Sequence, residues 1–118
     1  MTLTLSEKAL LCYNSALDKK ALDVLALDLR GISDVADVFL IASGTSRQQV
    51  QTIINAVEES LRGSGERSIR IEGYESARWA LLDAGDVIVH VFQEETREYY
   101  GLDRLWGDAA EFAFETAA

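Results

Sequence analysis

The sequence has no proline, one cysteine and one histidine among its 118 residues, and no Cys/His cluster with the spacing of metal ligands. The lone Cys12 cannot form an internal disulfide, so the sequence favours a reducing compartment and a fold without a metal. A single cysteine in an amphipathic helix is typically a small core hydrophobe. The chain also has no repeat and no linker, and its length is that of one domain.

Long apolar runs are absent as well. None approaches the roughly 18 residues that a membrane span requires. The N-terminus has neither the basic start of a signal peptide nor an Arg-rich transit pattern. We therefore expect a cytoplasmic protein with no membrane partner.

Basic residues are scarce, and the shortage is uneven. The net charge is −9, with nine acidic and eight basic residues over 1–71 but eleven acidic and three basic residues over 72–118. Such a C-terminal part would repel nucleic acid and attract a basic partner, although a solvated acidic face also aids solubility. The sequence therefore predicts no direct nucleic-acid specificity.

The hydrophobic periodicity predicts an alternation of helices and strands. A capping box at Thr4 and Glu7 starts the first helix, and a second box at Thr45 or Ser46 starts the most regular one. The predicted elements are a helix over 5–19, a strand over 22–29, a helical turn over 34–37, a buried strand over 38–42, a helix from 46 to Gly63 or Gly65, a strand over 69–72, a β-hairpin over 79–92 and one or two helical turns over 94–106.

The hairpin over 79–92 organises the fold. Its second strand is apolar on both faces, which is typical of a strand covered from both sides. We therefore predict an α/β domain with a mixed sheet of about five strands and helices packed on it. The domain should span residues 1–108, and residues 109–118 should form a short, poorly ordered tail.

Few residues suggest catalysis. Residues 43–46 at the start of a helix could bind a phosphate, but they lack the lysine and glycine spacing of a phosphate loop, so capping is the commoner role. The next acids, Glu58 and Glu59, are neighbours in a helix and cannot converge on one metal ion. Asp83 and Asp86 flank a hairpin turn, where aspartate is common without any catalytic role.

His90 has no nucleophile placed beside it by a recognisable motif, so a structural role is the simpler interpretation. Trp79 and the aromatic residues of 99–106 are different. Half of the tryptophans and tyrosines lie in that short acidic segment, as Tyr99, Tyr100 and Trp106. Aromatic anchors within an acidic rim are typical of a docking surface for a basic protein. The residues thus favour binding over catalysis.

Four motifs follow one another along the chain. They are ASGTSRQQV at 42–50, EG at 72–73 with a tryptophan at 79, DAGDVIVHVF at 83–92 and REYYGLDRLW at 97–106. Together they resemble the Iojap-like ribosomal silencing factor family over residues 5–108. Asp103 stands where that family usually has glutamate, and the tail after Asp108 has no counterpart.

The resemblance implies a nucleotidyltransferase-like topology without the metal-binding acids, no catalysis and no cofactor. It also implies a translational repressor that binds the large ribosomal subunit through its ribosomal protein fourteen. Such a protein would block joining of the small subunit and lower translation when nutrients are scarce. When free of the ribosome, an exposed aromatic face could pair with a second copy.

Site residues are carried over by the same resemblance, with Trp79 as the central anchor. Some residues of the C-terminal motif are expected to pack the last helix onto the sheet instead. The predicted partner-binding residues are Glu72, Trp79, Leu81, Asp83, Tyr100, Leu102, Leu105 and Trp106.

Two other interpretations stay open on the sequence. One is a nucleotidyltransferase-type enzyme that uses a magnesium nucleotide, which the absence of a closely spaced acidic pair after Ser46 argues against. The other is an antitoxin-like acidic module for some other basic protein.

Overall fold

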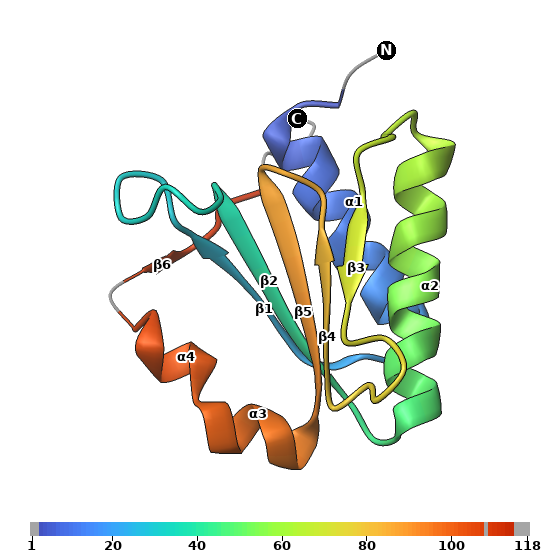
Figure 1. The fold of residues 1–118 in the computed structure, drawn as a ribbon. Coiled ribbons are helices and arrows are strands. Elements are labelled where there is room, and N and C mark those ends of the chain that lie inside the picture. The colour runs from blue at the N-terminus through green and yellow to red at the C-terminus, as the bar shows by residue number, and fades with distance from the viewer. Residues whose placement is uncertain (1–2, 108, 115–118) are drawn as a thin grey trace.

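The computed structural model describes residues 3–107 and 109–114, except for the side chain of Leu105. Its elements (Figure 1) are α1 (Leu5–Asp18), β1 (Leu22–Asp28), β2 (Val38–Gly44), α2 (Arg47–Gly63), β3 (Arg70–Glu72), β4 (Trp79–Asp83), β5 (Val87–Gln93), α3 (Glu94–Tyr100), α4 (Leu102–Leu105) and β6 (Ala110–Glu111).

One mixed sheet has the strand order β3-β4-β5-β2-β1-β6. The central strands β2 and β5 are parallel, and every other neighbouring pair in this order is antiparallel. Every residue of β2 is buried, and so are residues 87–92 of β5, as the continuous apolar runs of these strands predict. The predicted mixed α/β architecture is confirmed.

The helices α1 and α2 cover the first face of the sheet (Figure 1). The predicted capping box of α1 is present, because Thr4 Oγ1 accepts from Glu7 N–H and Glu7 Oε1 accepts from Thr4 N–H. Cys12 is fully buried in this layer, and burial raises the pKa of its thiol to about 12. An inert core thiol is what the sequence predicts.

The second face of the sheet has a smaller apolar cluster, and α3 and α4 cover one end of it. Its buried members come from several elements, and partly buried side chains, Trp79 and Leu81 among them, pack against them. The buried members are Leu27, Leu29, Ala36, Phe39, Ile41, Ile88, Phe92 and Leu102. This second face holds the candidate site.

Three expectations need correction. Among the described residues the sheet has six strands, because Ala110–Glu111, in the segment expected to be a poorly ordered tail, pairs with β1. Phe112 N–H donates to Ala26 O and its ring is 7% exposed, so pairing and burial hold this part in place. Residues 115–118 lie outside the described residues.

The helical turn expected over 34–37 is wrong, since those residues form bends before β2.

Candidate functional site

Alternation along β4 separates its two faces. Ala80 and Leu82 are buried under the helices, whereas Trp79, Leu81 and Asp83 point to the second face and are each half-buried. The strand register extends this surface sideways, because Glu72 pairs with Leu81 across β3 and β4. The structure therefore places four predicted residues on the second face of the sheet, at the edge formed by β3 and β4. They are Glu72, Trp79, Leu81 and Asp83.

Trp79 is held by three aromatic neighbours. Its indole stacks on Phe92 with ring centroids 5.0 Å apart at 25°, and Tyr100 lies at 4.9 Å from it at 49°. Its Nε1–H donates to Nδ1 of His90 at 3.1 Å. Because Trp79 is only half-buried, the tryptophan is a fixed apolar surface element that still offers area to a partner.

His90 is 4% exposed and neutral at physiological pH, because burial lowers the pKa of its imidazole from 6.5 to about 4. Since Nδ1 accepts from Trp79, the ring proton of the neutral form is on Nε2. Nε2 has no hydrogen-bond partner among the described residues. His90 therefore has a structural role, as the sequence indicates, and that role is to accept the hydrogen bond from the indole of Trp79.

The stability of the fold should depend on pH through His90. The pKa is about 4 when folded against 6.5 for a free imidazole, so the unfolded chain binds the proton more readily. This contribution is fully present above pH 6.5, is lost as the pH falls toward about 4, and changes no further below it. Urea unfolding at a series of pH values measures it. A His90→Gln variant, which has no imidazole to titrate, should lack this component; an identical pH profile would contradict the assignment.

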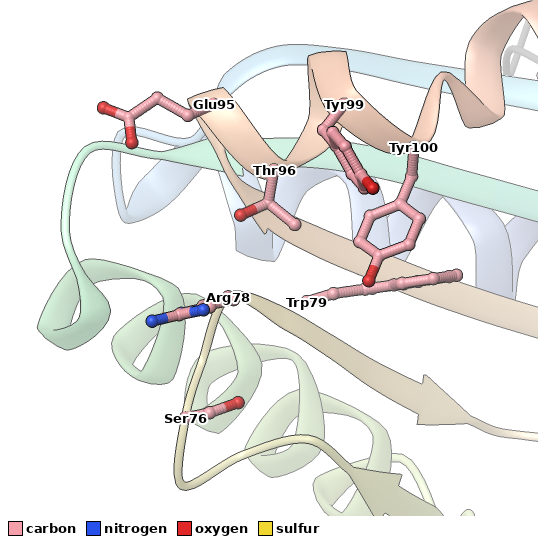
Figure 2. A pocket seen from close by; sticks show the side chains of 7 residues that line it. All are labelled: Ser76, Arg78, Trp79, Glu95, Thr96, Tyr99 and Tyr100. Atoms are coloured by element: carbon pink, nitrogen blue, oxygen red, sulfur yellow. The ribbon is translucent and has the colours of Figure 1, made fainter.

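Beside Trp79 lies a groove of about 650 Å³, between the loop before β4 and the outer side of α3 (Figure 2). Figure 2 shows the indole of Trp79 at its floor with the phenol of Tyr100 directed toward it and Tyr99 next to it. The side chains that line it are Ser76, Arg78, Trp79, Glu95, Thr96, Tyr99 and Tyr100.

Five of these groove residues are missing from the predicted partner-binding set. Tyr99 was noted only as one of the aromatic residues of 99–106, and Ser76, Arg78, Glu95 and Thr96 were not considered. These last four lie just before β4 and in the first turn of α3, and the start of β4 and the end of β5 are neighbours only once the hairpin has formed. In the structure Trp79 pairs with Phe92 and Gln93 N–H donates to Arg78 O, which brings these two segments together. No sequence signal indicates this proximity.

A charged side chain fixes the helices over this face. Arg97 of α3 donates through Nε and Nη2 to both carboxylate oxygens of Asp103, at 3.2 and 2.8 Å. Its Nη1 donates to Ser43 Oγ and to the carbonyl of Asp23. The Arg97 guanidinium holds the pKa of the Asp103 carboxyl below its usual range. Arg97 thereby joins α3 and α4 to the ends of β1 and β2.

The remaining predicted residues belong to α3, α4 and the residue after α4. Tyr100 is 54% exposed, whereas Leu102 is 7% exposed and packs within the second cluster. Trp106 is half-buried and meets Phe39 edge-on at 5.7 Å. Leu105 ends α4, and its side chain lies outside the described part. Tyr100 therefore presents surface to a partner, while Leu102 packs α4 onto the sheet.

Acidic side chains border the aromatic surface. Glu94, Glu95 and Glu98 are exposed on α3, and Glu72 is exposed on β3. The basic residue of α3, Arg97, is already paired with Asp103. Arg78 is an exposed base in the groove, but the four exposed acids outnumber it, so the net charge of this border is negative and favours a basic partner.

In the turn over 43–46, which could have bound a phosphate, the polar groups of Thr45 and Ser46 cap the N-terminus of α2 instead. Ser46 Oγ accepts from Gln49 N–H, and both N–H and Oγ1–H of Thr45 donate to Gln49 Oε1. Glu58 pairs with Arg62 along the helix surface. Within residues 3–107 and 109–114, no group of three or more His, Cys, Asp or Glu could hold a metal ion.

Asp86, the other candidate for metal chemistry, is bound to Lys8. The Lys8 side chain is 7% exposed, and its ammonium donates to Asp86 Oδ1 and Ala84 O, both at 2.6 Å, with Glu66 Oε2 at 3.2 Å. Burial opposes its charge, but hydrogen bonds to Asp86 and Glu66 outweigh burial and raise the pKa of Lys8. Asp83 Oδ1 accepts from Gly85 N–H, as a turn aspartate does.

Asp86→Asn should lower the free energy of unfolding by about 1–2 kcal/mol, because it removes a charge that compensates a buried ammonium. Chemical denaturation at neutral pH measures the change. Asp83→Asn is the matched control, since the amide oxygen of asparagine can still accept from Gly85 N–H. Equal losses in both variants would show that the ion pair with Lys8 contributes little.

The described helices include none that is both long and apolar enough to cross a membrane. A mixed α/β domain with an aromatic face beside an acidic helix has the features of a protein-docking domain. Comparison with known proteins identifies the family. The family model described as "Ribosomal silencing factor during starvation" matches residues 2–117, and the chain belongs to that family.

Relatives and solved structures support the assignment. The ribosomal silencing factor of Halalkalibacterium halodurans is 50% identical over 99 residues, covering 84% of this chain and 85% of the relative. A mouse protein named for mitochondrial assembly of the ribosomal large subunit is 28% identical over 91 residues, covering 75% of this chain and 40% of that protein. A crystal structure from Chromobacterium violaceum superposes with a TM-score of 0.87 at 33% identity, covering 98% of this chain and 96% of that one. The resemblance found in the sequence is confirmed, but the match runs to residue 117 and so includes the tail that was expected to have no counterpart. The family supports a ribosome-associated role in silencing translation.

Proposed function

We propose that this protein binds the large ribosomal subunit through ribosomal protein fourteen and sterically blocks joining of the small subunit. The effect is to lower translation when nutrients are limiting. The observation that carries the proposal is the second face of the sheet, where half-buried Trp79 and exposed Tyr100 stand beside exposed acids of α3 and β3. No step of this function requires catalysis or a cofactor.

The chemistry of the surface supports a basic protein partner. Proteins of the ribosome are typically basic, and residues 72–118 carry eleven acids against three bases. Long-range attraction would speed the encounter, while burial of the aromatic side chains would supply most of the affinity. An interface of about 800 Å² per partner is well within reach of one face of this domain.

The same surface supports two further expectations. A negative field disfavours direct nucleic-acid specificity, so contact with ribosomal protein should dominate over contact with ribosomal RNA. In the absence of the ribosome, the exposed side chains of Tyr99 and Tyr100, 81% and 54% exposed, could also pair with a second copy. Because the proposed target is the free large subunit, we expect the protein to act in the cytoplasm.

Sedimentation with purified ribosomal subunits tests the proposal. The protein should pellet with large subunits and stay in solution with small subunits, and added salt should weaken the binding because charge attraction contributes to it. Excess purified ribosomal protein fourteen should compete for it. Equal binding to both subunits, or no binding, would contradict the proposal.

A titration with magnesium nucleotide tests the alternative enzyme. Because Thr45 and Ser46 are used in capping and Asp86 pairs with Lys8, no binding is expected at millimolar nucleotide. Saturable binding abolished by Ser46→Ala or Asp86→Asn would favour the enzyme instead.

A further inference from the structure

The pair of Trp79 and His90 links the docking face to the buried centre of the sheet. The two residues come from adjacent strands, and their side chains meet diagonally, since Leu81 is the residue directly opposite His90. Stacking on Phe92 and contact with Tyr100 hold the plane of the indole, but a stacked ring can still slide or turn within that plane. The hydrogen bond from Nε1–H to Nδ1 of His90 is the directional contact.

The other ring nitrogen of His90 shows that the imidazole is costly at this position. Nε2 carries the proton of the neutral ring, is buried, and has no partner among the described residues. An unpaired buried donor is unfavourable, and an apolar side chain of similar size would avoid that cost. The surroundings are apolar enough to accept one, because Phe39 meets the imidazole edge-on at 4.5 Å and Phe92 lies at 6.4 Å. The cost of leaving Nε2 unpaired is expected where the other ring nitrogen, Nδ1, has a function that offsets it.

We propose that His90 is a positioning residue for docking, which fixes the in-plane orientation of the Trp79 indole by accepting its N–H and so sets the shape presented to the partner. His90 itself is 4% exposed and does not contact the partner. The inference rests on the proposed docking function, and it adds a residue that acts only through Trp79.

A double-mutant cycle separates this role from a purely structural one. The variants are His90→Leu, Trp79→Phe and the combination, and the measurement is the dissociation constant for large subunits. In the wild-type background, His90→Leu should weaken binding about tenfold, the effect of one oriented hydrogen bond. In the Trp79→Phe background, where no indole N–H exists, it should have almost no further effect. Additive effects of the two substitutions would overturn the proposal.

His90→Gln guards against a variant that simply folds badly. A glutamine side chain can accept the indole N–H through Oε1, so binding should recover most of what His90→Leu loses. The free energy of unfolding of each variant is measured beside its affinity. If affinity followed stability across the variants, with no rescue by glutamine, His90 would be only a core residue.

The free protein provides a readout that does not depend on the ribosome. The chain has one histidine and two tryptophans, so the ring nitrogens of His90 and the indole N–H groups of Trp79 and Trp106 can be assigned by NMR. Proton exchange of the Trp79 indole should be slow in the wild type and in His90→Gln but fast in His90→Leu, while that of Trp106 is unchanged. Equal exchange of Trp79 in all three would overturn the hydrogen bond. Failure of wild type to bind large subunits, with the exchange pattern intact, would overturn the docking role of His90 together with the proposed function.

Discussion

Replacing Trp79 by alanine should weaken binding to the large subunit about thirtyfold or more, a loss on the order of 2 kcal/mol. Trp79 stacks on Phe92, contacts Tyr100 and donates to His90, so its surface is held in place before the partner arrives. A preordered aromatic anchor loses little conformational entropy on binding, which is why such residues dominate interfaces. Titration of labelled protein against large subunits measures the effect.

Leu17→Ala is the matched control for this experiment. Leu17 is a large apolar residue, 45% exposed, on α1, which covers the first face of the sheet. Its removal should leave the affinity within about twofold of the wild type. Circular dichroism confirms that both variants are folded. An equal effect of the two substitutions, or no effect of Trp79→Ala, would show that binding uses another surface.

Gly73→Ala should destabilise the fold by about 3–5 kcal/mol. Gly73 has a φ of +73°, which alanine adopts only with strain. A Cβ added there would also lie 2.3 Å from the carbonyl oxygen of Trp79, a backbone atom that cannot move without shifting β4. The two costs add, since one is a strain of the residue itself and the other a displacement of its neighbour. Urea unfolding followed by circular dichroism measures the change.

Gly63→Ala controls for the general effect of adding a methyl group. Gly63 is the last residue of α2, and nothing lies within 4 Å of a Cβ built on it. Alanine there should leave stability unchanged or raise it by about 0.5–1 kcal/mol, because glycine is the poorer helix former. If Gly73→Ala were as mild as Gly63→Ala, the close approach of the β3–β4 loop to Trp79 would be wrong.

Local sequence signals predicted most of the fold. The helix α2 was predicted because its apolar residues recur with the helical period and its N-terminus has a capping serine. The strands β2 and β5 were predicted because each is a continuous apolar run. Such features depend on residues that are close in sequence, so no knowledge of the tertiary structure was required.

The sixth strand was missed for the opposite reason. Ala110–Glu111 has little β propensity of its own, and it becomes a strand because Phe112 is buried and the backbone pairs with Leu27 and Asp28 of β1. The lost helical turn over 34–37 has a similar origin, since Asp37 and Val38 donate their N–H groups to Asp86 O instead. Contacts across the sheet determine the conformation of both segments, and these contacts cannot be inferred from the local sequence of either one.

The candidate site was predicted only in part. The alternation of β4 placed Trp79, Leu81 and Asp83 together, because residues two apart in a strand share a face. The groove beside Trp79 was not predictable, because the segments that contribute Arg78 and Glu95 to its lining come together only after β4 and β5 pair. The acceptor role of His90 was hidden as well, since a diagonal contact depends on side-chain orientation and not on spacing.

The most direct test of the account is light scattering during the association of purified ribosomal subunits, with wild type and Trp79→Ala added at equal concentration. Under the proposed function, wild type slows or prevents the rise in scattering, and about thirtyfold more Trp79→Ala protein is required for the same inhibition. Subunits that join at the same rate with and without saturating wild-type protein would contradict it.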